Sequence, residues 1–167
     1  MVGLRVTKYN PALRSIEGSF LSDEWSSVSD IGRSFSGNVL TLGEYLAVES
    51  AYVNAVRFTM DLCRLSRLEV IEAEPQCRFG HLPCPIEDET RRMAVSIKNG
   101  AFLDQEGVGK VARLALREVF WCKLLGEHGF YVHFGHDYYM YIGYEFAPAL
   151  PSRFEKLFVE DFPSPYS

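Results

Sequence analysis

Two glutamates, Glu49 and Glu118, occupy positions where the surrounding pattern favours apolar side chains. When the helical segments that contain them are projected at about 100° per residue, Glu49 falls between Tyr45 and Val53, and Glu118 falls on the side of Val111. A buried carboxylate must be paired, hydrogen-bonded or protonated, because water no longer solvates its charge. We therefore expect both carboxylates to be buried and to need a partner.

These carboxylates allow two interpretations. If both face one cleft, they could serve as the acid and the base of an enzyme that acts on a small substrate. If each meets an inward basic or tyrosyl group instead, such as Arg5, Arg57 or a tyrosine of the C-terminal hairpin, their role is structural. Structural ion pairs perturb carboxylates as strongly as catalytic sites do, so we assign no catalytic residue and no cofactor.

A second group that could do chemistry runs from His133 to Asp137 and includes His136. Two histidines beside a carboxylate could bind a metal or act as a general base. On a strand, His133 points to one side, whereas His136 and Asp137 fall in the turn that follows. A hairpin turn also favours glycine and aspartate, so these residues need no catalytic explanation.

The four cysteines raise the question of a metal site or a disulfide. Cys77, His81 and Cys84 share one short segment and could supply three zinc ligands. Their spacing matches none of the standard zinc patterns, and no fourth ligand is evident. Cys63 and Cys122 fall in apolar helical patterns, where a free cysteine behaves as a small hydrophobic residue. We expect neither a metal nor a disulfide.

The negative charge is concentrated in one part of the chain. Residues 10–50 contain six carboxylates and two arginines, a local charge of −4 in a chain whose formal net charge is −5. Such a segment could steer and hold a basic partner, with an aromatic side chain as anchor. The candidate partner-binding residues here are Asp23, Glu24, Trp25, Asp30 and Glu44. The alternative is a solvated loop with Trp25 packed into the core.

Five of the nine tyrosines lie between residues 131 and 144. On a strand over 138–146, Tyr139 and Tyr141 share one face with Glu145, and the opposite face is apolar enough to form core. Tyrosine combines a large contact area with a polar tip, so we add Tyr139 and Tyr141 to the candidate partner-binding residues. An aromatic ladder between strands would explain them equally well.

The elements that must position these residues follow from the hydrophobic periodicity. Alternation predicts strands over 3–10, 68–74, 130–134 and 138–146, the last two joined as a hairpin. A period of 3.6 predicts helices over 41–65, 85–100 and 106–125. A short helical turn is expected within 22–31, another near 153–157, and an extended finish after it.

This order of elements predicts a single domain over residues 1–167 of the α+β class. Its core would be an approximately four-stranded, mostly antiparallel sheet with a C-terminal hairpin, packed against three main helices. In the helix over 106–125, Lys110, Arg113 and Arg117 form the polar side. Residues 107–110 do not complete a phosphate-binding loop, which needs a glycine where Asp104 stands and a hydroxyl where Val111 stands.

The composition excludes several classes of protein. With 47% hydrophobic and 23% charged residues, the chain is not intrinsically disordered. It contains no run of about 20 apolar residues, as a membrane helix requires, and its N-terminus shows no signal pattern, so we expect a cytoplasmic protein. The net charge of −5 argues against nucleic acid as a partner, because phosphate contacts need a basic surface.

Three strings of the sequence occur together: RVTKYNP at 5–11, DEW at 23–25 with DIG at 30–32, and HFGHDYYMY at 133–141. With them the chain resembles a poorly characterised family of small bacterial proteins associated with toxin loci as immunity proteins. The resemblance implies a protein that binds and neutralises a cognate toxin, such as a basic nuclease, and it supplies no catalytic residues. We therefore predict a non-enzymatic protein-binding protein; the enzyme described above and a homodimeric or larger structural protein stay open as alternatives.

Overall fold

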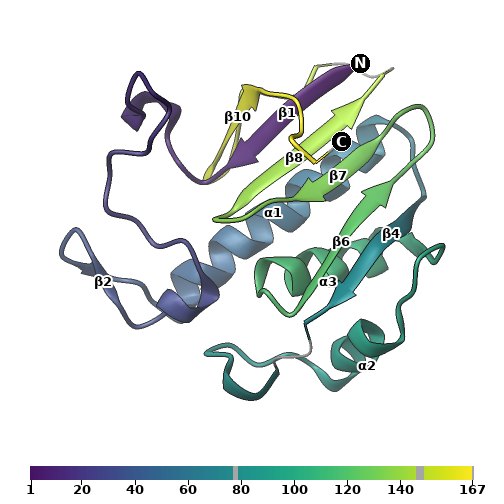
Figure 1. The fold of residues 1–167 in the computed structure, drawn as a ribbon, viewed down its shortest axis with the longest axis horizontal. Coiled ribbons are helices and arrows are strands. Elements are labelled where there is room, and N and C mark those ends of the chain that lie inside the picture. Colours follow the sequence, from purple (N-terminus) through teal and green to yellow (C-terminus); the bar gives the residue numbers. More distant parts are fainter. Residues whose placement is uncertain (77–78, 146–148, 167) are drawn as a thin grey trace.

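A large antiparallel sheet forms the centre of the protein (Figure 1). The computed structural model describes residues 1–76, 79–145 and 149–166, and eight strands of this sheet lie within them. Their bounds are β1 Val2–Thr7, β4 Arg67–Pro75, β5 Phe102–Asp104, β6 Phe120–Leu125, β7 Tyr131–Phe134, β8 Tyr139–Tyr144, β9 Arg153–Phe154 and β10 Leu157–Asp161. The strand order is β5-β4-β6-β7-β8-β1-β10-β9. The N-terminal strand β1 is therefore an interior strand, between β8 and β10.

The α+β class is correct, but the predicted sheet of about four strands is wrong, because eight strands pair in it. Strands β5 and β9 have only three and two residues, too few to show an alternating pattern. Strands β9 and β10 pair as a hairpin where a helical turn and an extended finish were predicted. Strand β6 replaces the second half of a predicted helix.

The helix α3, Gln105–Leu116, ends well before the predicted end near residue 125. Glu118 follows it with a left-handed φ of 60°. The N–H groups of Glu118 and Val119 donate to the carbonyls of Ala115 and Leu114 at 3.0 and 3.2 Å. These are the two hydrogen bonds of a Schellman motif, in which glycine usually takes the left-handed position. A glutamate there gives no stop signal, which is why the helical pattern predicts a helix over 106–125 that includes all of β6.

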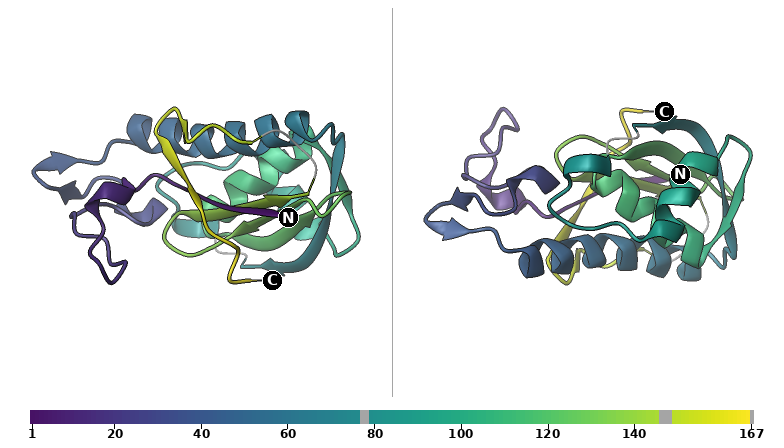
Figure 2. Two further views of the ribbon diagram at one scale, coloured as in Figure 1. Left: turned by 90° about the horizontal axis from the view of Figure 1, so that it is seen from above. Right: turned by 90° about the horizontal axis from the view of Figure 1, so that it is seen from below.

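The helices α1, Leu42–Leu62, and α3 cover one face of the sheet, and α2, Asp88–Ser96, packs against α3 (Figures 1 and 2). As predicted, α1 begins with a capping box, in which Thr41 and Glu44 bond each other's backbone N–H groups. The core lies between these helices and the sheet. Its fully buried members include Val6, Tyr52, Val56, Val111, Met140 and Ile142.

The C-terminal residues 162–166 cross the opposite face of the sheet (Figure 2). The Phe162 N–H donates to the Gly3 carbonyl at 3.0 Å. Further along, the Ser164 hydroxyl lies 2.7 Å from His133 Nδ1. Both faces of the central strands are therefore covered at least in part, one by helices and the other by this C-terminal segment.

Residues 11–41, which we call the projecting segment, extend beyond one end of the sheet (Figure 2). They contain two short 3-10 turns, Pro11–Leu13 and Val28–Asp30, and a two-stranded hairpin of β2, Ser34–Phe35, and β3, Asn38–Val39. The turn at Val28–Asp30 lies within the range where a helical turn was predicted.

Candidate functional site

Two of the carboxylates proposed for partner binding act as helix or turn caps. Asp30 is buried, accepts hydrogen bonds from the N–H groups of Ser26 and Ser27, and pairs with Arg33 at 2.8 Å. Burial alone would raise the pKa of Asp30, but these hydrogen bonds and the Arg33 charge hold it below its ordinary value. Glu44 is exposed and bonded to Thr41 in the capping box of α1. Of the two, only Glu44 is accessible to a partner.

Glu24 and Trp25 enclose a lysine. The Lys8 side chain is only 4% exposed, and its ammonium lies 3.0 Å from the Glu24 carboxylate. The same ammonium lies 4.2 Å from the centre of the Trp25 ring. Trp25 in turn packs against Tyr45 and Tyr138, with ring centres 5.6 and 4.9 Å away. Both residues thus attach the projecting segment to the domain, whatever they contribute to a partner.

The outer part of the projecting segment exposes apolar side chains together with carboxylates that have no cationic partner. Glu17 and Asp23 are exposed, and among the described residues neither forms an ion pair; Asp23 accepts from the N–H of Ser36 and so supports the β2–β3 hairpin. The exposed large hydrophobic side chains of this segment are Leu13, Ile16, Leu21 and Val39, and Leu42 follows it at the start of α1.

The two candidate tyrosines of β8 lie on the face that the C-terminal segment crosses. Tyr141 is buried, with its ring centre 5.8 Å from Tyr166 and 6.2 Å from Phe162. Tyr139 is partly exposed, and its hydroxyl accepts a hydrogen bond from Arg14 at 3.0 Å. The expectation that both present a free recognition face is therefore corrected for Tyr141, because the C-terminal segment covers it.

Glu49 is buried, as predicted, with 1% of its surface exposed. Arg117 donates from Nε and Nη2 to the two carboxylate oxygens at 2.6 and 2.7 Å, which is the strongest geometry for this pair. Tyr45 donates to the same carboxylate at 3.4 Å. Burial alone would lower the pKa of Arg117, but hydrogen bonds to Glu49 and its charge hold it above the ordinary value. The structural interpretation is thus supported, with Arg117 as the partner in place of Arg5 or Arg57.

Glu118 is not buried, contrary to the prediction, because the helix ends before it and the chain turns outward. The proposed pairing of Glu49 with Glu118 in one cleft therefore has no support: Glu49 lies in the Arg117 pair, and Glu118 lines a separate surface cleft. Arg117 itself was assigned to the solvent side of the helix. No signal in the sequence indicated that it turns inward, because its position relative to α1 depends on how the helices pack.

The cleft that contains Glu118 lies at one end of the sheet and has a volume of about 690 Å³. Its walls include the aromatic side chains of Trp121 and Tyr166, and its polar lining includes His136 and Asp137 from the β7–β8 turn. Ser26 and Ser27 of the projecting segment complete one side. The structure therefore brings Glu118, His136 and Asp137 to one cleft, whereas His133 lies elsewhere.

His133 is buried, 4% exposed, on the sheet face crossed by the C-terminal segment. Its Nδ1 lies 2.7 Å from the Ser164 hydroxyl, and its ring stacks on Tyr131 with centres 4.5 Å apart. Loss of hydration, together with the nearby Lys123 charge, lowers the pKa of His133 from 6.5 to about 4. A neutral, buried imidazole in this position is a structural group of the sheet.

The buried imidazole predicts a pH dependence of stability. The folded pKa of His133 is about 4 and lies below the ordinary 6.5, so between these values the unfolded chain binds a proton that the folded chain does not. We expect the free energy of unfolding to fall by on the order of 2 kcal/mol as pH falls through this interval. Denaturant titrations at several pH values would measure it. His133→Gln should lose this dependence of the free energy of unfolding on pH, whereas His136→Gln, at an exposed position, should keep it. Identical pH profiles for His133→Gln and the parent protein would contradict the assignment of the effect to His133.

The described residues contain no group of three or more metal-ligating side chains. Cys77, one of the three potential zinc ligands, lies outside the described residues. Cys84 is buried near Arg117, and burial raises the pKa of its thiol. Cys122 is also buried, in β6, and burial raises the pKa of its thiol to about 12. Both thiols are therefore held protonated and unreactive.

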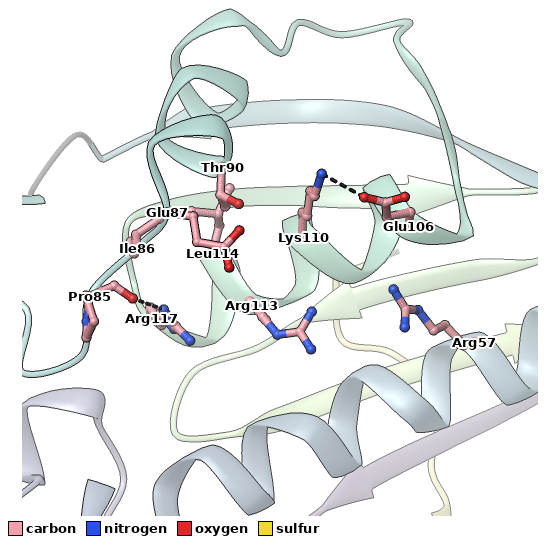
Figure 3. A pocket seen from close by; sticks show the side chains of 10 residues that line it. All are labelled: Arg57, Pro85, Ile86, Glu87, Thr90, Glu106, Lys110, Arg113, Leu114 and Arg117. Atoms are coloured by element: carbon pink, nitrogen blue, oxygen red, sulfur yellow. Dashed lines mark hydrogen bonds and ion pairs between the residues drawn. The ribbon is translucent and has the colours of Figure 1, made fainter. Parts of the chain in front are cut away.

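A second cavity, of about 360 Å³, lies between α1, α3 and residues 85–90 (Figure 3). Four cationic side chains line it, Arg57, Lys110, Arg113 and Arg117, together with the carboxylates of Glu87 and Glu106. The guanidinium groups of Arg57, from α1, and Arg113, from α3, both extend into the space between the two helices (Figure 3). The helical pattern predicts Arg113 on the polar side of its helix, and no signal in the sequence connects it with Arg57.

Comparisons with protein-family models, curated proteins and solved structures found no match. None of the helices in the described residues combines the length and the apolar character that a membrane span requires.

Proposed function

We propose that this protein is a non-enzymatic binding protein that docks a basic partner protein through its projecting segment. The observation that carries the proposal is the share of the exposed apolar side chains that this segment holds. The described residues include eleven exposed large hydrophobic residues, and four of them, Leu13, Ile16, Leu21 and Val39, belong to this one segment. Ile16 is fully exposed and Leu21 is 70% exposed. Exposed apolar groups that lie close together mark interaction surfaces more often than isolated ones do, and Leu13 and Leu21 are joined by a backbone hydrogen bond of 2.9 Å.

The charge around these apolar residues supports a basic partner. Glu17 and Asp23 lie in the same segment, and no cation of the described residues neutralises them. The neighbouring cleft is lined by three further carboxylates, Glu74, Glu118 and Asp137, and by the aromatic ring of Trp121. An apolar centre with a rim of one charge sign favours a partner of the opposite sign and accelerates its association.

The resemblance to immunity proteins gives the proposal its specific form. In that form the partner is a cognate toxin, and binding neutralises it by covering its active surface. A basic nuclease would complement the unpaired carboxylates. Tyr139, partly exposed beside the cleft, and Glu44, exposed at the start of α1, would extend the same contact.

The proposal predicts the effect of a paired substitution at the tip of the segment. Ile16→Ser with Glu17→Lys removes the most exposed apolar group and reverses an unpaired charge. An immunity protein and its toxin share a locus, so the partner to test is the product of the adjacent gene. We expect the Kd for that protein to rise at least about tenfold, and more at low salt, where charges are least screened. Calorimetry at two salt concentrations would measure it.

A matched control places the same two changes on other surfaces. Val95 on α2 is an exposed apolar residue, and Glu127 in the β6–β7 turn is an exposed carboxylate. Val95→Ser with Glu127→Lys should leave the Kd unchanged. Equal effects of the two double variants would refute the assignment of the surface, and a gene product that does not bind the parent protein at all would refute the assignment of the partner.

A further inference from the structure

The cavity between α1 and α3 contains two arginines whose N–H donors are only partly used, and Glu87, which also lines it, forms no ion pair among the described residues. Lys110 is paired with Glu89 and Glu106 at 2.7 and 2.9 Å. Arg117 is paired with the buried Glu49, as described above. These contacts account for two of the four cations that line the cavity. The other two, Arg57 and Arg113, have no short ion pair.

Arg57 has no carboxylate partner among the described residues. Its Nε donates to the carbonyl of Gln105 at 3.1 Å, and this bond leaves both terminal nitrogens available. The guanidinium is held against Gly109 of α3: a Cβ at that position would lie 2.5 Å from Nη2 and 3.0 Å from Cζ. The absence of a side chain at residue 109 therefore creates the space in which Arg57 lies.

Arg113 is only weakly engaged. Its Nε lies 3.7 Å from Glu49, whose two oxygens are already bonded by Arg117. Its Nη1 lies 3.5 Å from the carbonyl of Gly109, at the limit of a hydrogen bond. The side chain is 36% exposed, so the guanidinium can be reached from solvent. Two adjacent helices thus direct incompletely bonded guanidinium groups into one space (Figure 3).

We propose that this cavity binds a small phosphate monoester through Arg57 and Arg113. A guanidinium presents paired N–H donors that match the oxygens of a phosphate group, and bonds between two charged groups are the strongest of this kind. A phosphate monoester carries a charge of nearly −2 at neutral pH and three acceptor oxygens, so it can bond both guanidinium groups in the presence of the Glu87 carboxylate, whereas a carboxylate ligand has a single charge and two oxygens. The volume of about 360 Å³ fits a small molecule. This site shares no residue with the projecting segment and stands independently of the proposed function.

The experiment is calorimetric titration of the full chain with glycerol phosphate and with inorganic phosphate, at constant ionic strength maintained with chloride. We expect saturable binding of both, tighter for the ester, and no binding of acetate. Arg57→Gln should weaken the binding of glycerol phosphate at least about tenfold. Gly109→Ala should do the same, because its methyl group would displace the Arg57 guanidinium. Arg57→Lys, which keeps the charge and loses the paired donors, should also weaken binding.

Arg153→Gln is the matched control, because Arg153 is exposed and lies outside the cavity; it should bind as the parent protein does. Thermal unfolding of each variant without ligand shows whether the variant is folded. If Arg57→Gln is unfolded, Arg113→Gln provides a second test. Equal binding of acetate and glycerol phosphate would overturn the proposal, as would tighter binding of inorganic phosphate than of the ester, or unchanged binding by the folded Arg57 and Arg113 variants.

Discussion

Replacing Arg117 by methionine is expected to lower the free energy of unfolding by about 3 to 5 kcal/mol, because it leaves the buried Glu49 carboxylate without its partner. The guanidinium supplies both short hydrogen bonds to that carboxylate, at 2.6 and 2.7 Å. It also donates to the carbonyl of Pro85 at 2.8 Å, so the substitution releases the loop before α2 as well. Equilibrium denaturation in urea would measure the loss.

The double variant Glu49→Leu with Arg117→Met tests whether the loss of stability comes from the unpaired Glu49 carboxylate. Removing both charges abolishes the cost of an unpaired buried carboxylate, so the double variant should be more stable than Arg117→Met alone. Arg92→Met is the control, since Arg92 is exposed on α2; it should change stability by less than about 0.5 kcal/mol. A loss below about 1 kcal/mol for Arg117→Met would show that water reaches Glu49 and that the pair is not a structural centre.

Replacing Glu24 by lysine is the second substitution with a large expected effect, a loss of about 2 to 4 kcal/mol. The Lys8 ammonium is nearly buried and lies 3.0 Å from Glu24, with the rings of Tyr9 and Trp25 4.0 and 4.2 Å away. Burial already lowers the pKa of Lys8. The substitution places a second ammonium beside Lys8 and removes Glu24, the one carboxylate among the described residues that forms an ion pair with it, so the buried charge of Lys8 is no longer compensated. Glu24 itself is 34% exposed, which keeps the loss below that of a fully buried pair.

Glu17→Lys is the control for Glu24→Lys. It makes the same change of charge, but Glu17 forms no ion pair among the described residues. It should alter stability by less than about 0.5 kcal/mol, so the difference between the two variants measures the structural role of Glu24. Similar stabilities of Glu24→Lys and Glu17→Lys would contradict that role. The comparison also matters for binding experiments, because a weaker interaction of Glu24→Lys with a partner would reflect partial unfolding, whereas Glu17→Lys reports on the surface alone.

Local patterns in the sequence were sufficient to predict the elements whose signals come from residues close together in the chain. The capping box of Thr41 and Glu44 identified the start of α1, and the burial of Glu49 followed from its position on that helix. The alternation in β1, β7 and β8 was long enough to identify each strand. Such signals arise between residues a few positions apart, so no tertiary contact is needed to recognise them.

Elements without a recognisable local signal were missed. β9 contains two residues, too few to alternate, and pairs with β10 as a hairpin, and β10 in turn pairs with the distant β1. Glu118 takes a left-handed conformation without the glycine that would indicate it, so the transition from α3 to β6 was not visible. Tyr141 looked available because the alternation of a strand does not show whether a later segment crosses its face.

The local patterns of the sequence establish an α+β protein with a buried glutamate in its first helix and with its unbalanced acidic residues near the N-terminal third. Which charges find a partner depends on the tertiary fold. Arg117 neutralises Glu49, and Lys8 meets Glu24, whereas among the described residues Glu17 and Arg57 form no ion pair and Arg113 forms only a long one, 3.7 Å from Glu49. An ion pair requires two side chains within a few ångströms in a shared low-dielectric environment. Helix packing and strand order, not spacing along the chain, set those distances.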